Sequence, residues 1–203
     1  MKVVMHRAES FIFIGRSGCG KGTQAELLRK YLKERDPDRA VFYLETGEKF
    51  REFVRGEKYT HRLSHDVYMR AERQPDFLAV HLWGHILIDE LAGGEHLIID
   101  GTPRSVHEAE ILDTAMKFYG YEKPFVIFID VSRKWATERL RARGREDDVR
   151  AEEIKKRLDW FDADVMPAVS YFKRHPDYAF VAVNGEQTVA EVHQEMMRKM
   201  YGV

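Results

Sequence analysis

The sequence has 203 residues and nearly balanced charges, 33 Lys and Arg against 34 Asp and Glu, for a net charge of −1. The length suits one α/β domain with small inserted lobes, and the charge balance argues against a dedicated nucleic-acid-binding or membrane-surface protein. A single cysteine excludes an intramolecular disulfide, and no apolar run approaches the roughly 20 residues of a membrane span, so we expect a cytoplasmic monomer.

A glycine-rich loop follows the first predicted strand, residues 11–14, and leads into a predicted helix, residues 23–35. Strand, glycine loop, lysine and helix in this order wrap backbone N–H groups around phosphate oxygens. Lys21 is then placed to reach the β- and γ-phosphates of ATP. The alternative is an ordinary strand-to-helix turn, since Gly22 separates the lysine from the hydroxyl of Thr23. The candidate ATP-binding residues are Gly15, Ser17, Gly18, Cys19, Gly20, Lys21, Gly22 and Thr23.

The second predicted strand, residues 41–44, is followed by a long polar insertion, residues 46–76. A hydroxyl at Thr46, then Gly47 and then Arg51 suit a second anion site. We expect the insertion to be helical and to carry this anion site; it is either a mobile cover or an ordinary inserted helical pair. A helix is predicted over residues 77–91.

The third predicted strand, residues 97–99, ends at Asp100. An aspartate in this position, beside the strand of a phosphate loop, predicts a Mg²⁺ site, held through water together with Thr23. The alternative for Asp100 is a turn cap. Gly101, Thr102 and Pro103 then form a sharp turn that projects Arg104 toward the same crevice, where a guanidinium suits bidentate phosphate recognition. The alternative for Arg104 is a solvated surface arginine.

The rest of the chain predicts a helix at 106–118, a strand at 125–129, helices at 133–143 and 152–172, a strand at 179–183 and a helix at 189–200. The charged residues 144–150 predict a short lid loop. Four arginines in this region are candidates for charge neutralisation during phosphoryl transfer, and a solvated charged helix end is the alternative. They are Arg139, Arg143, Arg145 and Arg157. We expect Trp160 and Phe161 to pack in the core.

The five predicted strands are continuously apolar rather than alternating, which is typical of parallel strands covered on both faces. Helical segments lie between them. The expected fold is therefore an α/β three-layer sandwich around a five-stranded parallel sheet, of the P-loop NTPase type.

Five motifs together give the chain a specific resemblance. It resembles the adenylate kinase family of nucleoside-monophosphate kinases, with the motifs in the family's order and spread over nearly the whole chain. They are Gly-Lys-Gly-Thr-Gln at 20–24, Thr-Gly-Glu-x-x-Arg at 46–51, Asp-Gly-Thr-Pro-Arg at 100–104, Glu-Arg-Leu-x-x-Arg at 138–143 and Arg-x-Asp-Asp at 145–148.

The resemblance implies roles for individual residues. Residues 18–23 would hold the donor phosphates, with Arg139 and Gln187 at the donor base and Arg143 on its phosphates. Arg145 and Arg157 would clamp the transferred group. Arg157 aligns with the family's arginine only when the alignment allows one inserted residue after Asp148. The implied acceptor-binding residues are Thr46, Gly47, Arg51, Gln74, Gly101, Thr102, Pro103, Arg104, Glu108, Arg145 and Arg157.

The chain departs from the family at the acceptor base. Glu108 stands where the family has a glutamine that binds the acceptor base. Residues 71–75 replace the family's segment Gly-x-Leu-Val-Pro, and Thr102 replaces the aromatic residue of its motif Asp-Gly-Phe-Pro-Arg. We predict a kinase that transfers the γ-phosphate of Mg-ATP to a nucleoside monophosphate, with AMP as acceptor. The alternatives are GMP, CMP or UMP as acceptor, a kinase of another small molecule such as a nucleoside, and a non-catalytic nucleotide sensor.

Overall fold

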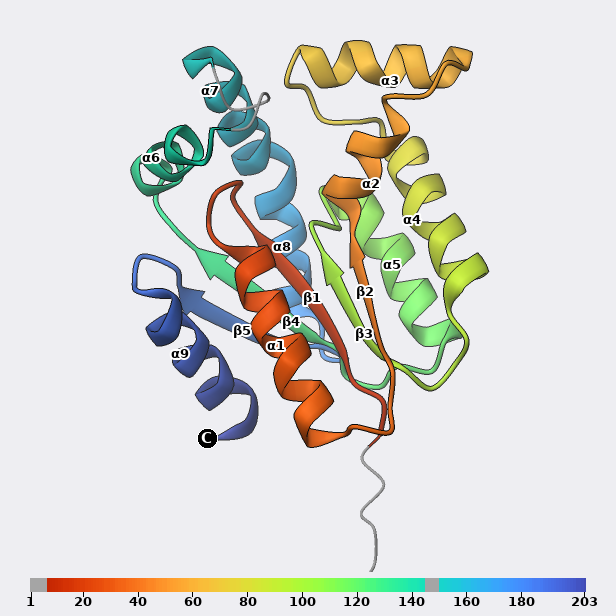
Figure 1. Ribbon diagram of the computed structural model, residues 1–203, viewed down its shortest axis with the longest axis vertical. Helices are drawn as coiled ribbons and strands as arrows, with labels where there is room; N and C mark the ends of the chain where they lie inside the picture. Colours follow the sequence, from red (N-terminus) through yellow and green to blue (C-terminus); the bar gives the residue numbers. More distant parts are fainter. Residues whose placement is uncertain (1–6, 145–149) are drawn as a thin grey trace, which may run out of the picture.

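A five-stranded sheet forms the centre of the computed structural model, which describes residues 7–144 and 150–203 (Figure 1). All neighbouring strands are parallel, in the order β2-β3-β1-β4-β5. The carboxyl ends of β1 and β3 are adjacent, because Phe13 pairs with Asp100. The strands are β1 (Ser10–Gly15), β2 (Val41–Glu45), β3 (His96–Asp100), β4 (Phe125–Asp130) and β5 (Ala179–Asn184).

Helices cover both faces of the sheet, so the predicted three-layer α/β fold is confirmed (Figure 1). One face packs against α1 (Lys21–Arg35) and α9 (Val189–Tyr201), and the other against α4 (Asp76–Glu90), α5 (Val106–Phe118) and α8 (Met166–Arg174). Beyond the carboxyl ends of the strands lie α2 (Thr46–Phe53), α3 (Tyr59–Met69), α6 (Arg133–Arg143) and α7 (Ala151–Trp160).

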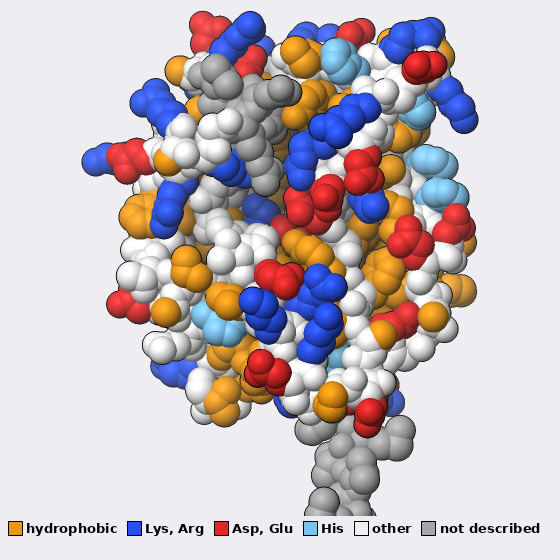
Figure 2. Space-filling view, in the orientation of Figure 1, with side chains coloured by type: hydrophobic (Ala, Val, Ile, Leu, Met, Phe, Trp, Pro, Cys, Tyr) orange, Lys and Arg blue, Asp and Glu red, His pale blue; other side chains and the backbone are white. Residues whose placement is uncertain are grey.

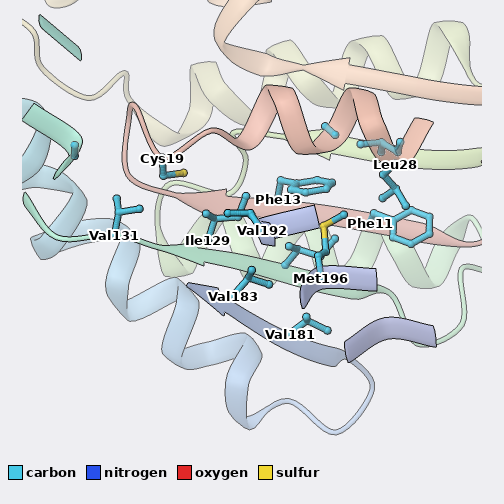
Figure 3. Packing of buried hydrophobic residues seen from close by; sticks show 14 of the residues in the cluster. Phe11, Phe13, Cys19, Leu28, Ile129, Val131, Val181, Val183, Val192 and Met196 are labelled. Atoms are coloured by element: carbon cyan, nitrogen blue, oxygen red, sulfur yellow. The ribbon is translucent and has the colours of Figure 1, made fainter. Parts of the chain in front are cut away.

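Strand β1 shows why the strands are continuously apolar. Phe11 and Phe13 are fully buried in one core cluster, with α1 and α9 residues such as Leu28 and Met196 (Figure 3). The alternate residues of β1, Ile12 and Ile14, are buried in a second cluster on the opposite face. Successive side chains of a strand point to opposite faces, so a strand buried on both sides has no polar position.

The predicted helix over residues 152–172 is wrong as a continuous α-helix. The segment divides into α7, a π-helix (Phe161–Val165) and α8. Pro167 explains the division, because it has no N–H to donate and its ring clashes with the carbonyl four residues earlier, at Ala163. A widened turn at that carbonyl accommodates the proline ring.

The remaining element boundaries differ from the predictions by one or two residues at most, as helix and strand ends usually do. In the described part of the chain, no helix combines the length and apolar character that crossing a bilayer requires. Most of the predicted lid loop, and Arg145 with it, lies outside the described residues.

Candidate active site

The glycine-rich loop between β1 and α1 forms one wall of a large crevice at the carboxyl edge of the sheet. Gly18 and Gly20 have φ values of 85° and 95°, a left-handed conformation that favours glycine. Gly20 is the N-cap of α1, so the first free N–H groups of the helix open toward the crevice. The Nζ of Lys21 donates to the carbonyl oxygens of Gly15 (2.8 Å) and Arg16 (3.3 Å).

Two residues fix this loop closely against the sheet. A Cβ at Gly15 would lie 2.6 Å from the carbonyl oxygen of Ile129, so only glycine fits there. Cys19 is buried, and its Sγ lies 3.8 Å from Lys21 Nζ. Burial raises the pKa of this thiol, which Lys21 opposes. The loop is thus held in shape by packing as well as by its lysine.

Asp100, at the end of β3, lies on the floor of the crevice beside the loop. Its Oδ2 accepts a hydrogen bond from the Tyr43 hydroxyl (3.3 Å), and a Cβ at Gly22 would lie 3.5 Å from the same oxygen. Burial raises the pKa of Asp100, which the charge of Lys21 opposes. Thr23 is exposed at the same crevice.

These oxygen ligands fit Mg²⁺, which takes one or two protein carboxylates and keeps water and substrate phosphate as its other ligands. In the described residues there is no group of three or more His, Cys, Asp or Glu side chains arranged to hold a metal. A cation at Asp100 would therefore be held by few protein atoms, as Mg²⁺ usually is.

The opposite wall carries two arginines that converge on Gly47. A Cβ at Gly47 would lie 3.3 Å from Arg51 Nη1 and 3.7 Å from Arg104 Nη2. Arg51 also pairs with Glu45 (2.9 Å), and Arg104 Nε donates to the carbonyl of Gly101 (2.9 Å). Burial lowers the pKa of Arg104, and the nearby charges of Arg157 and Arg51 add to this while Glu108 opposes it. Such a cluster of cations favours a bound anion.

The other described arginines that the sequence singles out also line the crevice, together with Gln187. The guanidinium of Arg139 lies over the Trp135 ring at 5.1 Å, and the Cβ of Arg139 would lie 3.5 Å from a Cβ at Gly18 of the loop. Gln187 Nε2 donates to Asn184 O (2.9 Å) and to Glu195 Oε2 (2.7 Å). The lining arginines are Arg51, Arg104, Arg139, Arg143 and Arg157.

Three described candidate residues do not line the crevice: Thr46, Thr102 and Glu108. Thr46 is buried, and its hydroxyl donates to the carbonyl of Asp100 (3.0 Å). Glu108 is fully buried in the first turn of α5, and neither of its carboxylate oxygens has a hydrogen-bond partner.

Gln74 lines the crevice, but its side-chain amide is engaged with Ser64 of α3. Gln74 Oε1 accepts from the Ser64 hydroxyl, and Nε2 donates to the Ser64 carbonyl, both at 2.9 Å. These paired bonds tie the segment before α4 to α3. The side chain of Gln74 therefore contributes to the shape of the site through this tie.

Sequence reasoning missed several residues of the site. Trp160 packs against the core cluster that contains the buried Phe161, as predicted, but both residues also line the crevice. Arg104 lies 6.0 Å from the Trp160 ring and 5.8 Å from that of Phe50. An arginine that faces aromatic rings keeps a fixed orientation. No local pattern indicates this contact, because the three residues are far apart in the sequence.

The crevice as a whole has a volume of about 680 Å³, within the range of ligand pockets. Figure 2 shows the molecule hollowed between the α6–α7 side and the α2–α3 side. One wall offers helix N–H groups and Lys21, the other offers Arg51 and Arg104, and Asp100 lies between them. This arrangement suits two phosphate-bearing ligands that meet end to end.

Comparison with known proteins gives a consistent result. The family model described as "Adenylate kinase" matches residues 13–176. An adenylate kinase of Prochlorococcus marinus (strain AS9601) is 28% identical over 190 residues, which cover 93% of this chain and 97% of that protein. One from Porphyromonas gingivalis (strain ATCC 33277) is 30% identical over 80% of this chain and 81% of its own length. One from Corynebacterium aurimucosum (strain ATCC 700975) is 29% identical over 94% of this chain and 98% of its own length.

Proposed function

The chain belongs to the adenylate kinase family, and from this premise we propose that it transfers the γ-phosphoryl group of ATP to AMP and forms two molecules of ADP. The observation that carries the proposal is the convergence of two phosphate-binding walls on one crevice. Lys21 and the N-terminus of α1 form the donor wall, and Arg51 and Arg104 form the acceptor wall. A phosphorylated acceptor explains the second wall, whereas an uncharged acceptor such as a nucleoside does not.

On the donor side, we assign the phosphates of ATP to residues 18–23. Their backbone N–H groups and the positive end of the α1 dipole favour anionic oxygens. Lys21 Nζ exchanges its carbonyl partners, Gly15 and Arg16, for the β- and γ-phosphate oxygens. We assign the donor base to Arg139 and Gln187 and the donor phosphates also to Arg143, because all three side chains line the crevice.

On the acceptor side, we assign the phosphate of AMP to Arg51 and Arg104, with Gly47 giving it room to approach. A side chain at Gly47 would crowd both guanidinium groups, because even its Cβ would lie 3.3 Å from Arg51. Arg157 lines the same crevice, near enough to Arg104 to add to the effect of burial in lowering its pKa, and suits the transferred group. The residues 46–76 hold the acceptor in this assignment.

Asp100 and Thr23 would hold Mg²⁺ in this crevice, through water where the ion does not touch the protein. The ion supplies neutralisation of charge on the β- and γ-phosphate oxygens when it is bound. Asp100 is suited to the role because its carboxylate is buried beside Lys21 and is positioned by Tyr43.

The chemistry needs alignment and charge neutralisation rather than a general base. An oxygen of the AMP phosphate, already anionic at neutral pH, attacks the γ-phosphorus. The new O–P bond forms as the bond to the β–γ bridging oxygen breaks, and that oxygen leaves as part of ADP. Lys21 and the arginines stabilise the negative charge on the transferred group, and the fixed walls keep the two phosphates in line.

A coupled assay of ADP formation tests the function directly. Purified protein is supplied with Mg-ATP and, in parallel, with AMP, GMP, CMP or UMP. We expect ADP to form fastest with AMP. If none of the four supports ADP formation above the rate without acceptor, the transferase proposal is wrong and the chain is a nucleotide-binding protein without turnover.

A further inference from the structure

The π-helix borders the crevice, which its residues Phe161 and Val165 line. It carries Asp162 and Asp164, and residues two apart along a helix point to opposite sides. The carboxylate of Asp162 bonds to Arg16 in the phosphate loop, and that of Asp164 bonds to Arg73 in the segment before α4. These contacts join residues 146 and 91 positions apart in the sequence.

The contact on the donor side fixes the phosphate loop from behind. Arg16 Nη2 donates to Asp162 Oδ1 (2.6 Å), and Nη1 donates to the carbonyl of Val131 (2.8 Å). The guanidinium also lies 4.9 Å from the Phe161 ring, and only 14% of the Arg16 side chain is exposed. Arg16 does not line the crevice, yet its carbonyl is one of the two that hold Lys21.

The contact on the acceptor side fixes the segment formed by residues 71–74. Arg73 Nε donates to Asp164 Oδ2 (3.1 Å), and Trp160 Nε1 donates to the carbonyl of Ala71 (3.3 Å). Ala71 has a φ of 54°, a left-handed conformation that costs a residue with a Cβ about 1 kcal/mol. Ala71 and Gln74 line the crevice, so these contacts hold a strained part of its wall.

We propose that Asp162 and Asp164 are positioning residues that make the π-helix a common support for the two nucleotide sites. Asp162 acts through Arg16 on the phosphate loop, and Asp164 acts through Arg73 on residues 71–74. The assignment of these halves to ATP and AMP rests on the proposed function. Rigid support matters because in-line transfer tolerates little displacement of the reacting groups, and an error of about 1 Å costs up to ~100-fold in rate.

Hydrogen exchange of the ligand-free protein tests the support without reference to the reaction. We expect Asp162→Asn to speed amide exchange about fivefold in residues 15–20 but not in residues 70–74, and Asp164→Asn to speed it in residues 70–74 but not in residues 15–20. Asp162 also pairs with Arg133 (2.7 Å), and Asp159→Asn is the matched control, because Asp159 pairs with Arg133 and Lys155 but not with Arg16. Faster exchange in both segments with either variant, or in neither, overturns the proposal.

Steady-state kinetics of the same variants distinguishes a local effect on one nucleotide site from a general loss of stability. We expect Asp162→Asn and Arg16→Met each to raise the KM for ATP about fivefold, with the KM for AMP within about twofold of the wild type, and the double variant to be no worse than either. Asp164→Asn gives the reverse pattern. Parallel changes in both KM values contradict the proposal. An inactive wild type refutes the proposed function instead, and the exchange pattern then decides on the support alone.

Discussion

Lys21 and Arg104 stand on opposite walls of the crevice, and each presents its charge where a phosphate oxygen would bind. We expect Lys21→Ala and Arg104→Ala each to lower kcat by at least about 100-fold, as the loss of one transition-state donor usually does. The measurement is the rate of ADP formation at saturating ATP and AMP. Lys30→Ala, an exposed change on the same helix as Lys21, serves as the control. Variants that keep most of the activity would remove these two residues from the proposed mechanism.

Glu108 is a buried carboxylate whose two oxygens have no hydrogen-bond partner. Burial raises its pKa, Arg104 opposes the shift and Asp76 adds to it. A raised folded-state pKa favours the protonated form, so stability falls as the pH rises from about 4 through the folded-state pKa. At neutral pH this buried carboxyl group therefore contributes less stability than it does near pH 4, although Arg73 lies 3.8 Å away.

We expect Glu108→Gln to increase the free energy of unfolding at pH 7.5 by about 1 kcal/mol, because the amide carries no charge to bury. Arg73 keeps its bonds to Asp76 and Asp164 in the variant. Urea unfolding measures the effect, and the gain should disappear near pH 4, where the wild-type group is protonated. A gain that is equal at pH 4 and pH 7.5 would show that ionisation of Glu108 is not its cause.

At the level of elements, the sequence predicts the motifs whose residues are contiguous and misses the contacts between segments that are distant in the sequence. The phosphate loop and the turn at Asp100 are contiguous motifs, so most of their residues line the crevice, with Arg16 and Thr102 as the exceptions. The π-helix and the Arg16–Asp162 and Arg73–Asp164 contacts depend on packing between distant segments, which no spacing encodes. For Thr46, the sequence predicts a residue that lies beside the site, but it does not predict that the hydroxyl donates to the backbone carbonyl of Asp100 instead of facing the crevice.

His96 begins β3 at the opposite edge of the sheet and ties this strand to the residues before β1 and to the end of α1. The side chain is fully buried; its Nδ1 accepts from the Glu9 amide (3.1 Å), and its Nε2 faces Asp36 at 3.5 Å. Burial, with Arg35 and Arg39, lowers the pKa of His96 to about 4, and Asp36 opposes this. A lowered pKa means that stability is present above about pH 6.5 and is lost as the pH falls toward 4.

We therefore expect the free energy of unfolding of His96→Gln to fall less than that of the wild type between pH 7 and pH 4.5, by about 2 kcal/mol. Urea unfolding at a series of pH values gives the two slopes. His81→Gln, on the exposed face of α4, is the matched control and should follow the wild type. Parallel slopes for His96→Gln and the wild type would mean that another group causes the loss of stability in acid.

For the whole molecule, a ligand that occupies both walls should stabilise the fold more than a ligand that occupies one. The test ligand is a dinucleotide in which five phosphates join two adenosines. At a concentration of 100 times its Kd, we expect it to stabilise the protein by about 2.7 kcal/mol and to raise Tm by about 5–10 °C. Thermal unfolding with and without the ligand measures this. At the same ligand concentration Arg104→Ala should reduce the rise, whereas Lys30→Ala should not. An equal rise in Arg104→Ala would place the ligand away from the acceptor wall.

Cys19 is the sole cysteine of the chain, and it sits where the hydrophobic core meets the phosphate loop (Figure 3). A thiol-specific reagent has one target, and it reaches that target only when the loop lifts from β4. The rate of modification therefore counts openings of the loop, because the buried thiol is protected in the closed form. The protein thus carries a native chemical reporter within the loop that we propose binds ATP, without an introduced probe.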